Sequence, residues 1–130
     1  MNRIELEERL INFAVMIVDL TESMTGGRSA QHLSGQLLRS GTSPALNYGE
    51  AQSAESARDF IHKIQIVLKE LRETNICLKI IGRTNSAVNK EKLEAILKEN
   101  NELISIFVKT VSTAQKNQKQ PTLTSEIENR

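Results

Sequence analysis

Apolar residues recur every three or four positions through most of the chain, which is the spacing of one face of an α-helix. Three segments carry the clearest stripes: Leu6, Leu10, Phe13, Ile17, Leu20 and Met24; Phe60, Ile64, Leu68, Leu71 and Leu78; Leu93, Leu97, Ile104, Phe107 and Val111. Gly26 and Gly27 follow the first stripe, and Ser56 with Asp59 precedes the second as a helix N-cap. Asn100 interrupts the third, where a polar residue can set the register between helices. The pattern predicts three amphipathic helices.

The segment from about residue 28 to residue 51 is harder to assign. It contains four residues that are poor in helix interiors: Gly35, Gly41, Pro44 and Gly49. Yet one helical face collects Leu33, Leu37, Gly41, Ala45 and Tyr48, and the small residues on it allow another helix to approach closely. We therefore predict a second helix, kinked near Pro44. Hydroxyl groups around the proline are expected to bond carbonyl oxygens one turn back and support the kink.

Four helices joined by short loops, with no alternating run long enough for a sheet, indicate an all-α fold. We predict an antiparallel up-and-down four-helix bundle over residues 1–117. Residues 118–130 are polar and contain a proline, so we expect a mobile tail there.

The first and third helices carry more apolar residues than one bundle-facing stripe requires. The surplus residues are Ile4, Ile11, Val15, Val18, Ile66, Val67, Ile76 and Ile80. Surplus apolar surface commonly marks an interface, so these are candidates for contacts in a homo-oligomer. The alternative is a wide face buried inside a single bundle.

The charge of the chain is balanced but unevenly distributed. With 17 Lys and Arg against 16 Asp and Glu the net charge is +1, which argues against a strongly basic nucleic-acid coat protein. The third and fourth helices are nevertheless basic, and their candidates for phosphate contact are Lys63, Lys69, Arg72, Lys79, Arg83, Lys90 and Lys92. A solvated helix face is the alternative, because aromatic residues for base stacking make up only 3% of the chain.

No arrangement of residues indicates an enzyme. Asp59 and His62 have the spacing of ligands in helical di-metal proteins, but no second acid–histidine pair accompanies them, so a metal-binding helical enzyme is the weakest alternative. Cys77 lies among apolar residues, which favours a buried structural thiol. We expect no metal, no cofactor and no catalytic residue.

Cysteine usage and hydropathy bear on the compartment. A single cysteine cannot form an internal disulfide, which favours a reducing compartment, and we expect the cytoplasm. The most apolar stretch, residues 10–20, is shorter than the ~20 residues of a membrane helix, and acidic residues precede it where a signal peptide is basic. We expect neither membrane association nor export.

The polar residues of the second helix resemble a known family. Ser40-Gly41-Thr42-Ser43, then Asn47-Tyr48-Gly49-Glu50-Ala51, then Ser56 and Asp59-Phe60, are similar to a pattern in the four-helix-bundle proteins encoded by intervening sequences of bacterial 23S rRNA genes. The family pattern consists of Ser-Ala-Thr-Ser, three further residues, and Asn-Ile-Ala-Glu-Gly. A Ser and an Asp-Phe that opens the next helix follow. The resemblance covers residues from about 8 to 116, with departures at Gly41, Tyr48, Gly49 and Ala51.

The resemblance implies antiparallel four-helix protomers that assemble into ring-like homopentamers without enzymatic activity. It also implies kinship with the accessory protein of diversity-generating retroelements, in which a basic ring works with a reverse transcriptase and nucleic acid. We therefore predict a non-enzymatic oligomeric scaffold or adaptor whose partners are itself and RNA or another protein. An RNA-binding ring that uses the basic third and fourth helices is the alternative.

The polar residues of this region are expected to be mainly structural: Arg39, Ser40, Thr42, Ser43, Asn47, Glu50, Ser56 and Asp59. Asn47 and Glu50 lie one turn apart on one helical face. There Asn47 is placed to bond a neighbouring helix, and Glu50 to pair with Arg39 or Arg72. A subunit interface and a ligand site are the alternatives for this pair.

Overall fold

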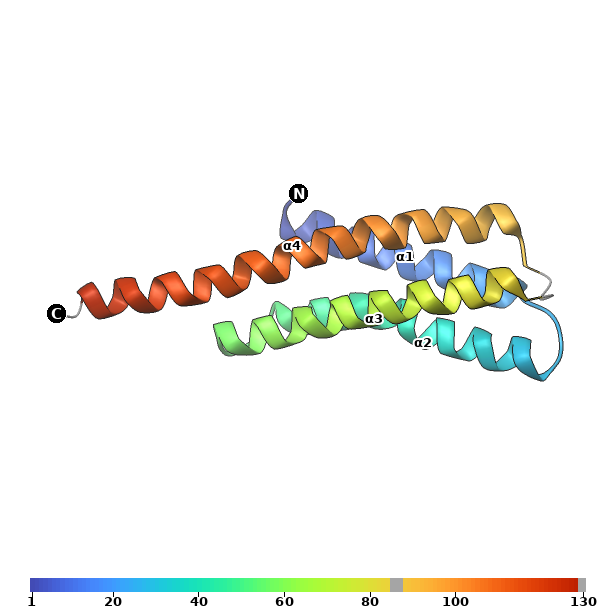
Figure 1. The fold of residues 1–130 in the computed structure, drawn as a ribbon, viewed down its shortest axis with the longest axis horizontal. Coiled ribbons are helices and arrows are strands. Elements are labelled where there is room, and N and C mark those ends of the chain that lie inside the picture. The colour runs from blue at the N-terminus through green and yellow to red at the C-terminus, as the bar shows by residue number, and fades with distance from the viewer. Residues whose placement is uncertain (85–87, 129–130) are drawn as a thin grey trace.

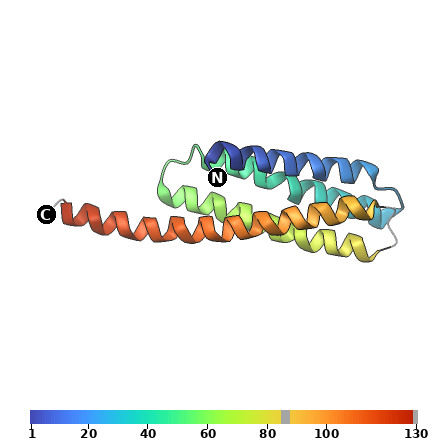
Figure 2. The same cartoon turned by 90° about the horizontal axis from the view of Figure 1, so that it is seen from above.

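The computed structural model describes the backbone of residues 1–84 and 88–128 and the side chains of residues 1–84 and 88–118. It contains four α-helices: α1 (Arg3–Ser23), α2 (Arg28–Ala51), α3 (Ala57–Arg83) and α4 (Lys90–Glu128). Each helix runs antiparallel to the one before it, and α4 continues past the end of the other three (Figures 1 and 2). The prediction of an all-α protein with four helices is confirmed.

The helices form a bundle in which neighbours in the chain are neighbours in space. Helix α1 packs against α2 and α4, and α3 packs against the same two helices. Within the described ranges no Cα atom of α1 lies within 8 Å of a Cα atom of α3, so these helices occupy diagonal corners of the bundle. The outward surfaces of α1 and α3 therefore point in opposite directions.

Local sequence signals account for the helix starts. At the start of α1 the Asn2 side chain accepts a hydrogen bond from the Glu5 amide at 2.9 Å, and the Glu5 carboxylate accepts one from the Asn2 amide, forming a capping box. At the start of α3 the Ser56 hydroxyl accepts from the Asp59 amide at 3.1 Å, which confirms the predicted N-cap. Between α1 and α2, Gly26 has φ 139°, a conformation that favours glycine.

The predicted apolar stripes form the core. Fully buried side chains include Leu10, Phe13, Ile17, Leu20, Leu37, Ile64, Leu71, Leu78, Leu103 and Phe107. The Tyr48 and Phe107 rings meet edge to face with centroids 5.6 Å apart. Gly41 is buried where α2 crosses α1, and a Cβ there would lie 2.6 Å from Ile17 Cγ1. Its lack of a side chain is what allows α1 and α2 to approach.

A polar residue lies within this core. Asn100 of α4 is fully buried and its Nδ2 donates to the Leu71 carbonyl of α3 at 2.9 Å. Its Oδ1 has no hydrogen-bond partner among the described residues. Asn100 therefore links α3 to α4 at one point along their length, at the expense of one desolvated acceptor.

Two expectations about the helices, a kink in α2 and mobility after residue 117, stay predictions. Helix α2 continues through Pro44, which is buried, so the proline does not end it; the kink stays a prediction. The backbone of residues 118–128 continues α4, and the mobility expected for residues 118–130 stays a prediction.

Candidate functional site

The outward surface of α1 is apolar. Ile4, Ile11, Val15 and Val18 lie on the side of the helix opposite its buried stripe and are 63%, 42%, 53% and 38% exposed. We call these residues, with the exposed acids Glu8, Asp19 and Glu22 beside them, the α1 outer face. These four apolar residues lie outside the bundle core, as their predicted interface role requires; contact with another copy stays a prediction.

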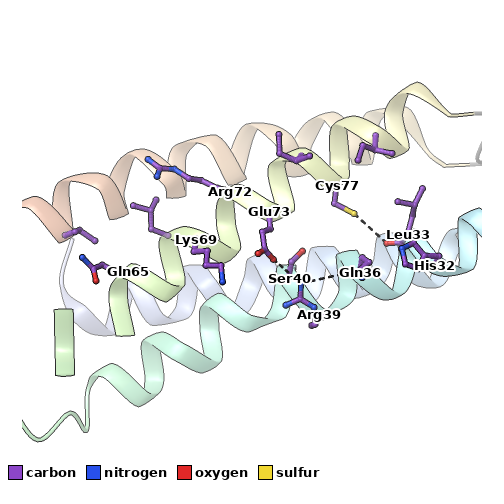
Figure 3. Close-up of a pocket in the computed structure, with 14 residues that line it drawn as sticks. His32, Leu33, Gln36, Arg39, Ser40, Gln65, Lys69, Arg72, Glu73 and Cys77 are labelled. Carbon is purple, nitrogen blue, oxygen red and sulfur yellow. Dashed lines mark hydrogen bonds and ion pairs between the residues drawn. The ribbon is translucent and has the colours of Figure 1, made fainter. Parts of the chain in front are cut away.

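The outward surface of α3 combines apolar and basic side chains. Ile76 and Ile80 are 56% and 45% exposed. We call them, with the exposed residues that share their side of the helix, the α3 outer face: Lys69, Arg72, Ile76, Lys79, Ile80 and Arg83. An open groove of about 930 Å³ runs over this face between α2 and α3 and reaches Val111 of α4 (Figure 3). Leu33 and Leu68 add apolar lining to it.

Two of the predicted interface residues do not belong to this surface. Val67 is fully buried, because it lies on the core side of α3 with Ile64 and Leu71, and the prediction of an interface role is wrong for it. Ile66 is half-buried at the border of the core. The outward apolar surface of α3 is therefore narrower than its sequence indicates.

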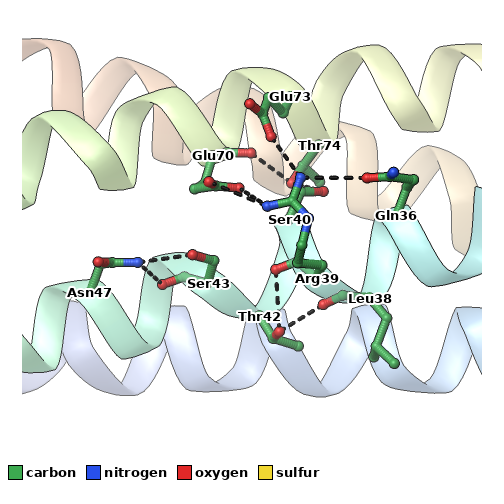
Figure 4. A network of polar contacts seen from close by, with 10 residues as sticks. All are labelled: Gln36, Leu38, Arg39, Ser40, Thr42, Ser43, Asn47, Glu70, Glu73 and Thr74. Carbon is green, nitrogen blue, oxygen red and sulfur yellow. Dashed lines mark hydrogen bonds and ion pairs between the residues drawn. The ribbon is translucent and has the colours of Figure 1, made fainter.

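Two polar residues of α2 contact polar residues of α3. Arg39 Nη1 lies 3.2 Å from Glu70 Oε2, and Nη2 lies 3.0 Å from Glu73 Oε2 (Figure 4). Burial raises the pKa of the Glu70 carboxyl, Glu73 adds to this rise, and Arg39 opposes it. Deeper in the contact, the buried hydroxyls of Ser40 and Thr74 are 3.0 Å apart. These five residues form what we call the α2–α3 clasp.

The predicted partners of Glu50 and Asn47 need correction. Glu50 pairs with Lys63, not with Arg39 or Arg72, because antiparallel helices joined by a short loop bring together residues at equal distances from that loop. Asn47 does not bond a neighbouring helix: its Nδ2 donates to the carbonyl and hydroxyl of Ser43 on its own helix, at 3.0 and 2.8 Å.

The hydroxyl groups near Pro44 behave partly as predicted. The Thr42 hydroxyl donates to the Leu38 carbonyl one turn back, at 2.6 Å. Ser40 instead contacts Thr74 across the helices, and Ser43 accepts from Asn47. Sequence reasoning missed the partners on α3; the signal that points to them is the order of Glu70, Glu73 and Thr74 on the side of α3 that faces α2.

Comparison with known proteins identifies the family. Residues 3–109 match the family model of the 23S rRNA-intervening sequence protein. The chain belongs to that family. It is similar to a protein of unknown function from the S23 ribosomal protein family of Bacteroides thetaiotaomicron VPI-5482, whose crystal structure was determined at 1.70 Å resolution. The two are 33% identical, with a TM-score of 0.74, over 86% of this chain and 99% of the other. None of the curated proteins matches the chain.

The predicted phosphate-binding residues of this 23S rRNA-intervening sequence protein fall into three groups. Lys63 is held by Glu50 at the end of the bundle where α2 meets α3. Lys69, Arg72, Lys79 and Arg83 are exposed on the α3 outer face and form no ion pair with another described residue. Lys90 and Lys92 are exposed in the first turn of α4.

The structure also describes the metal-ligand side chains, the cysteine and the hydropathy of the helices. In the part of the chain that it describes, no group of three or more His, Cys, Asp or Glu side chains is placed to hold a metal ion. Cys77 is buried with its Sγ 3.7 Å from the Leu33 carbonyl, and burial raises the pKa of its thiol, which disfavours the nucleophilic thiolate. None of the helices, over the same residues, is long and apolar enough to cross a membrane.

Proposed function

We propose that this family member is a non-enzymatic scaffold that works as a homo-oligomer. The observation that carries the proposal is the α1 outer face, on which four large apolar side chains share one exposed side of one helix. Scattered exposed apolar residues are ordinary in monomeric proteins, whereas a continuous stripe of them favours association. A helix that is apolar on two opposite sides has a second surface to bury.

The form of the assembly follows from the family resemblance. We place it at five copies arranged in a ring, in the cytoplasm, with each protomer kinked in α2 near Pro44. The ring supplies a repeated surface on which a partner protein docks. This role needs no reacting group, in keeping with the raised pKa of the Cys77 thiol.

Light scattering coupled to size-exclusion chromatography tests the proposal. We expect a mass of five times the 14.6 kDa protomer. Val15→Asp places a charge in the middle of the α1 outer face and should lower the mass toward one protomer. Leu46→Asp is the matched control, since Leu46 is also exposed, at 69%, but has no exposed apolar residue one turn away on α2. A protomer mass for the unmodified chain at micromolar concentration would contradict the proposal.

RNA binding through α3 is the second candidate, and a specific observation favours it. The four exposed cations of the α3 outer face lie on one side of one helix without ionic partners among the described residues, an arrangement able to meet successive phosphates. Binding of this kind should weaken steeply with salt and be lost on Lys69→Glu with Arg72→Glu. Unchanged RNA retention by the double variant would exclude it.

A further inference from the structure

The two outer faces carry opposite charges. On the α1 outer face the charged residues beside the apolar stripe are Glu8, Asp19 and Glu22, all acidic and exposed. None of them forms an ion pair with another described residue. On the α3 outer face the charged residues are two lysines and two arginines, which also form no ion pair within the described part of the chain. The nearby Glu73 is already bound by Arg39.

The two faces also match in length and in their apolar spacing. Ile4 to Val18 and Lys69 to Arg83 each span fourteen residue steps, or about 21 Å at ~1.5 Å per residue. Each face has an apolar pair one turn apart, Ile11 with Val15 and Ile76 with Ile80. The groove over α3, with Leu33 and Leu68 in its lining, gives the apolar side chains of a docked helix a place to be buried.

Charge excludes the pairing of either face with itself. Two α1 outer faces in contact bring six carboxylates together, and two α3 outer faces bring eight cations together. Like charges facing one another across an interface oppose association. The acidic face against the basic face instead provides both apolar burial and opposite charges.

We propose that the α1 outer face of one copy docks onto the α3 outer face of the next. Because α1 and α3 occupy diagonal corners of the bundle, a copy presents its two faces in opposite directions. Copies therefore join head to tail, and such a contact closes into a ring when the rotations between successive copies add up to a full turn. This inference rests on the proposed oligomer and names its contact.

Charge reversal with rescue tests the docking without assuming a register. Variant A reverses the α1 face by Glu8→Lys, Asp19→Lys and Glu22→Lys. Variant B reverses the α3 face by Lys69→Glu, Arg72→Glu, Lys79→Glu and Arg83→Glu. All seven side chains are exposed and unpaired among the described residues, so the protomer should stay helical, which circular dichroism checks. The control reverses Glu55, Glu91 and Glu94, which are exposed away from both faces.

We expect A alone and B alone to fall to the protomer mass and the control to keep the oligomer mass. Combining both sets in one chain should restore the oligomer, because the two faces are then complementary again at every contact. Mixing A with B should produce A–B complexes, although strict alternation cannot close a ring of five. Restoration is the result that misfolding of either variant does not produce.

The remaining outcomes separate the inference from the proposed function. An oligomeric unmodified chain whose mass survives both A and B overturns the docking and leaves the oligomer in place. A variant B that keeps its mass but loses bound RNA assigns the α3 outer face to nucleic acid and also overturns the docking. A monomeric unmodified chain overturns both.

Thiol cross-linking supplies a second measurement. In a Cys77→Ala background, one chain carries Val15→Cys and another Ile76→Cys, and a short bis-maleimide joins cysteines at a contact. The docking predicts cross-linked pairs only when the two chains are mixed. Efficient cross-linking within the Val15→Cys chain alone would show that α1 outer faces meet each other, contrary to the inference.

Discussion

The α2–α3 clasp and the two outer faces differ in how their polar groups are used. In the clasp, Arg39 is bound by Glu70 and Glu73, and the hydroxyls of Ser40 and Thr74 meet in the core. On the α1 and α3 outer faces, apolar side chains are exposed and the charges beside them have no ionic partner among the described residues. The polar residues of the clasp therefore hold α2 against α3. The candidate interaction surfaces are instead made of exposed residues of α1 and α3.

The difference between the helix contacts and the outer faces predicts that substitutions in the two regions change different properties. Changes inside the α1–α2 and α2–α3 contacts should alter the free energy of unfolding, and changes on the outer faces should alter the oligomer mass. Surface substitutions away from special features usually change stability by less than about 0.5 kcal/mol, which leaves mass as their main readout.

The largest stability effect is expected at the crossing of α1 and α2. A Cβ at Gly41 would lie 2.6 to 2.8 Å from three atoms of the fully buried Ile17 side chain. Gly41→Ala should therefore lower the free energy of unfolding in urea by about 1–3 kcal/mol. Gly35→Ala on the same helix is the control, because no atom lies within 4 Å of its added Cβ. It should raise the free energy of unfolding by about 0.5–1 kcal/mol, the usual helix preference for alanine. Equal effects at the two positions would contradict the close approach.

These contacts show what the sequence predicts and what it does not. The stripes of α1, α3 and α4 are predictable because the 3.6-residue period directly reflects which side meets the core. In α2 the same pattern identified Gly41 as a place of close approach despite three other residues that disfavour helix. The sequence does not show where the wide apolar face of α3 passes from the core to the surface. For this reason it places Val67, which is fully buried, among the interface candidates.

Pairing between helices was less predictable. Arg39 and Glu50 were each recognised as members of a pair, but their partners depend on the register of α2 against α3. Counting outward from the loop between these helices brings Glu50 opposite Lys63 and Ser40 opposite Thr74. The charge of a residue indicates that it has a partner of opposite charge. The topology of the bundle is needed to identify that partner.

The next effect concerns the polar residue in the core. Asn100 makes one hydrogen bond to Leu71 and leaves a buried acceptor without a partner among the described residues. Asn100→Leu should raise the free energy of unfolding by about 1 kcal/mol, because it replaces that desolvated acceptor with an apolar side chain that has the same number of heavy atoms. Asn100→Ala, which adds a cavity, should lower it. A loss of stability on Asn100→Leu would show that its bond to α3 outweighs the desolvation.

The smallest effect contrasts two ion pairs through pH. Arg9 of α1 donates to Glu99 of α4 at 2.7 Å, and this hydrogen bond lowers the pKa of the Glu99 carboxyl. Folding stabilises the ionised Glu99 carboxylate. The pair therefore adds to the free energy of unfolding above the carboxyl pKa of the unfolded chain, and this contribution is lost as the pH falls through the lower pKa of the folded protein. Glu99→Gln should therefore reduce stability at pH 7, by up to about 1 kcal/mol for a half-buried pair still screened by solvent, and the difference should vanish in acid.

Glu70 in the α2–α3 clasp should behave with the opposite sign. Burial holds the pKa of the Glu70 carboxyl above its ordinary value in spite of Arg39, so the folded protein binds this proton more tightly than the unfolded chain does. Stability then decreases as pH rises from the unfolded value through the folded pKa. Glu70→Gln should remove that decrease and leave the protein slightly more stable at pH 7. Thermal unfolding of both variants between about pH 2.5 and pH 7, on both sides of the ordinary carboxyl pKa of about 4.3, measures the two slopes. Parallel slopes would mean that burial does not distinguish the clasp from the α1–α4 pair.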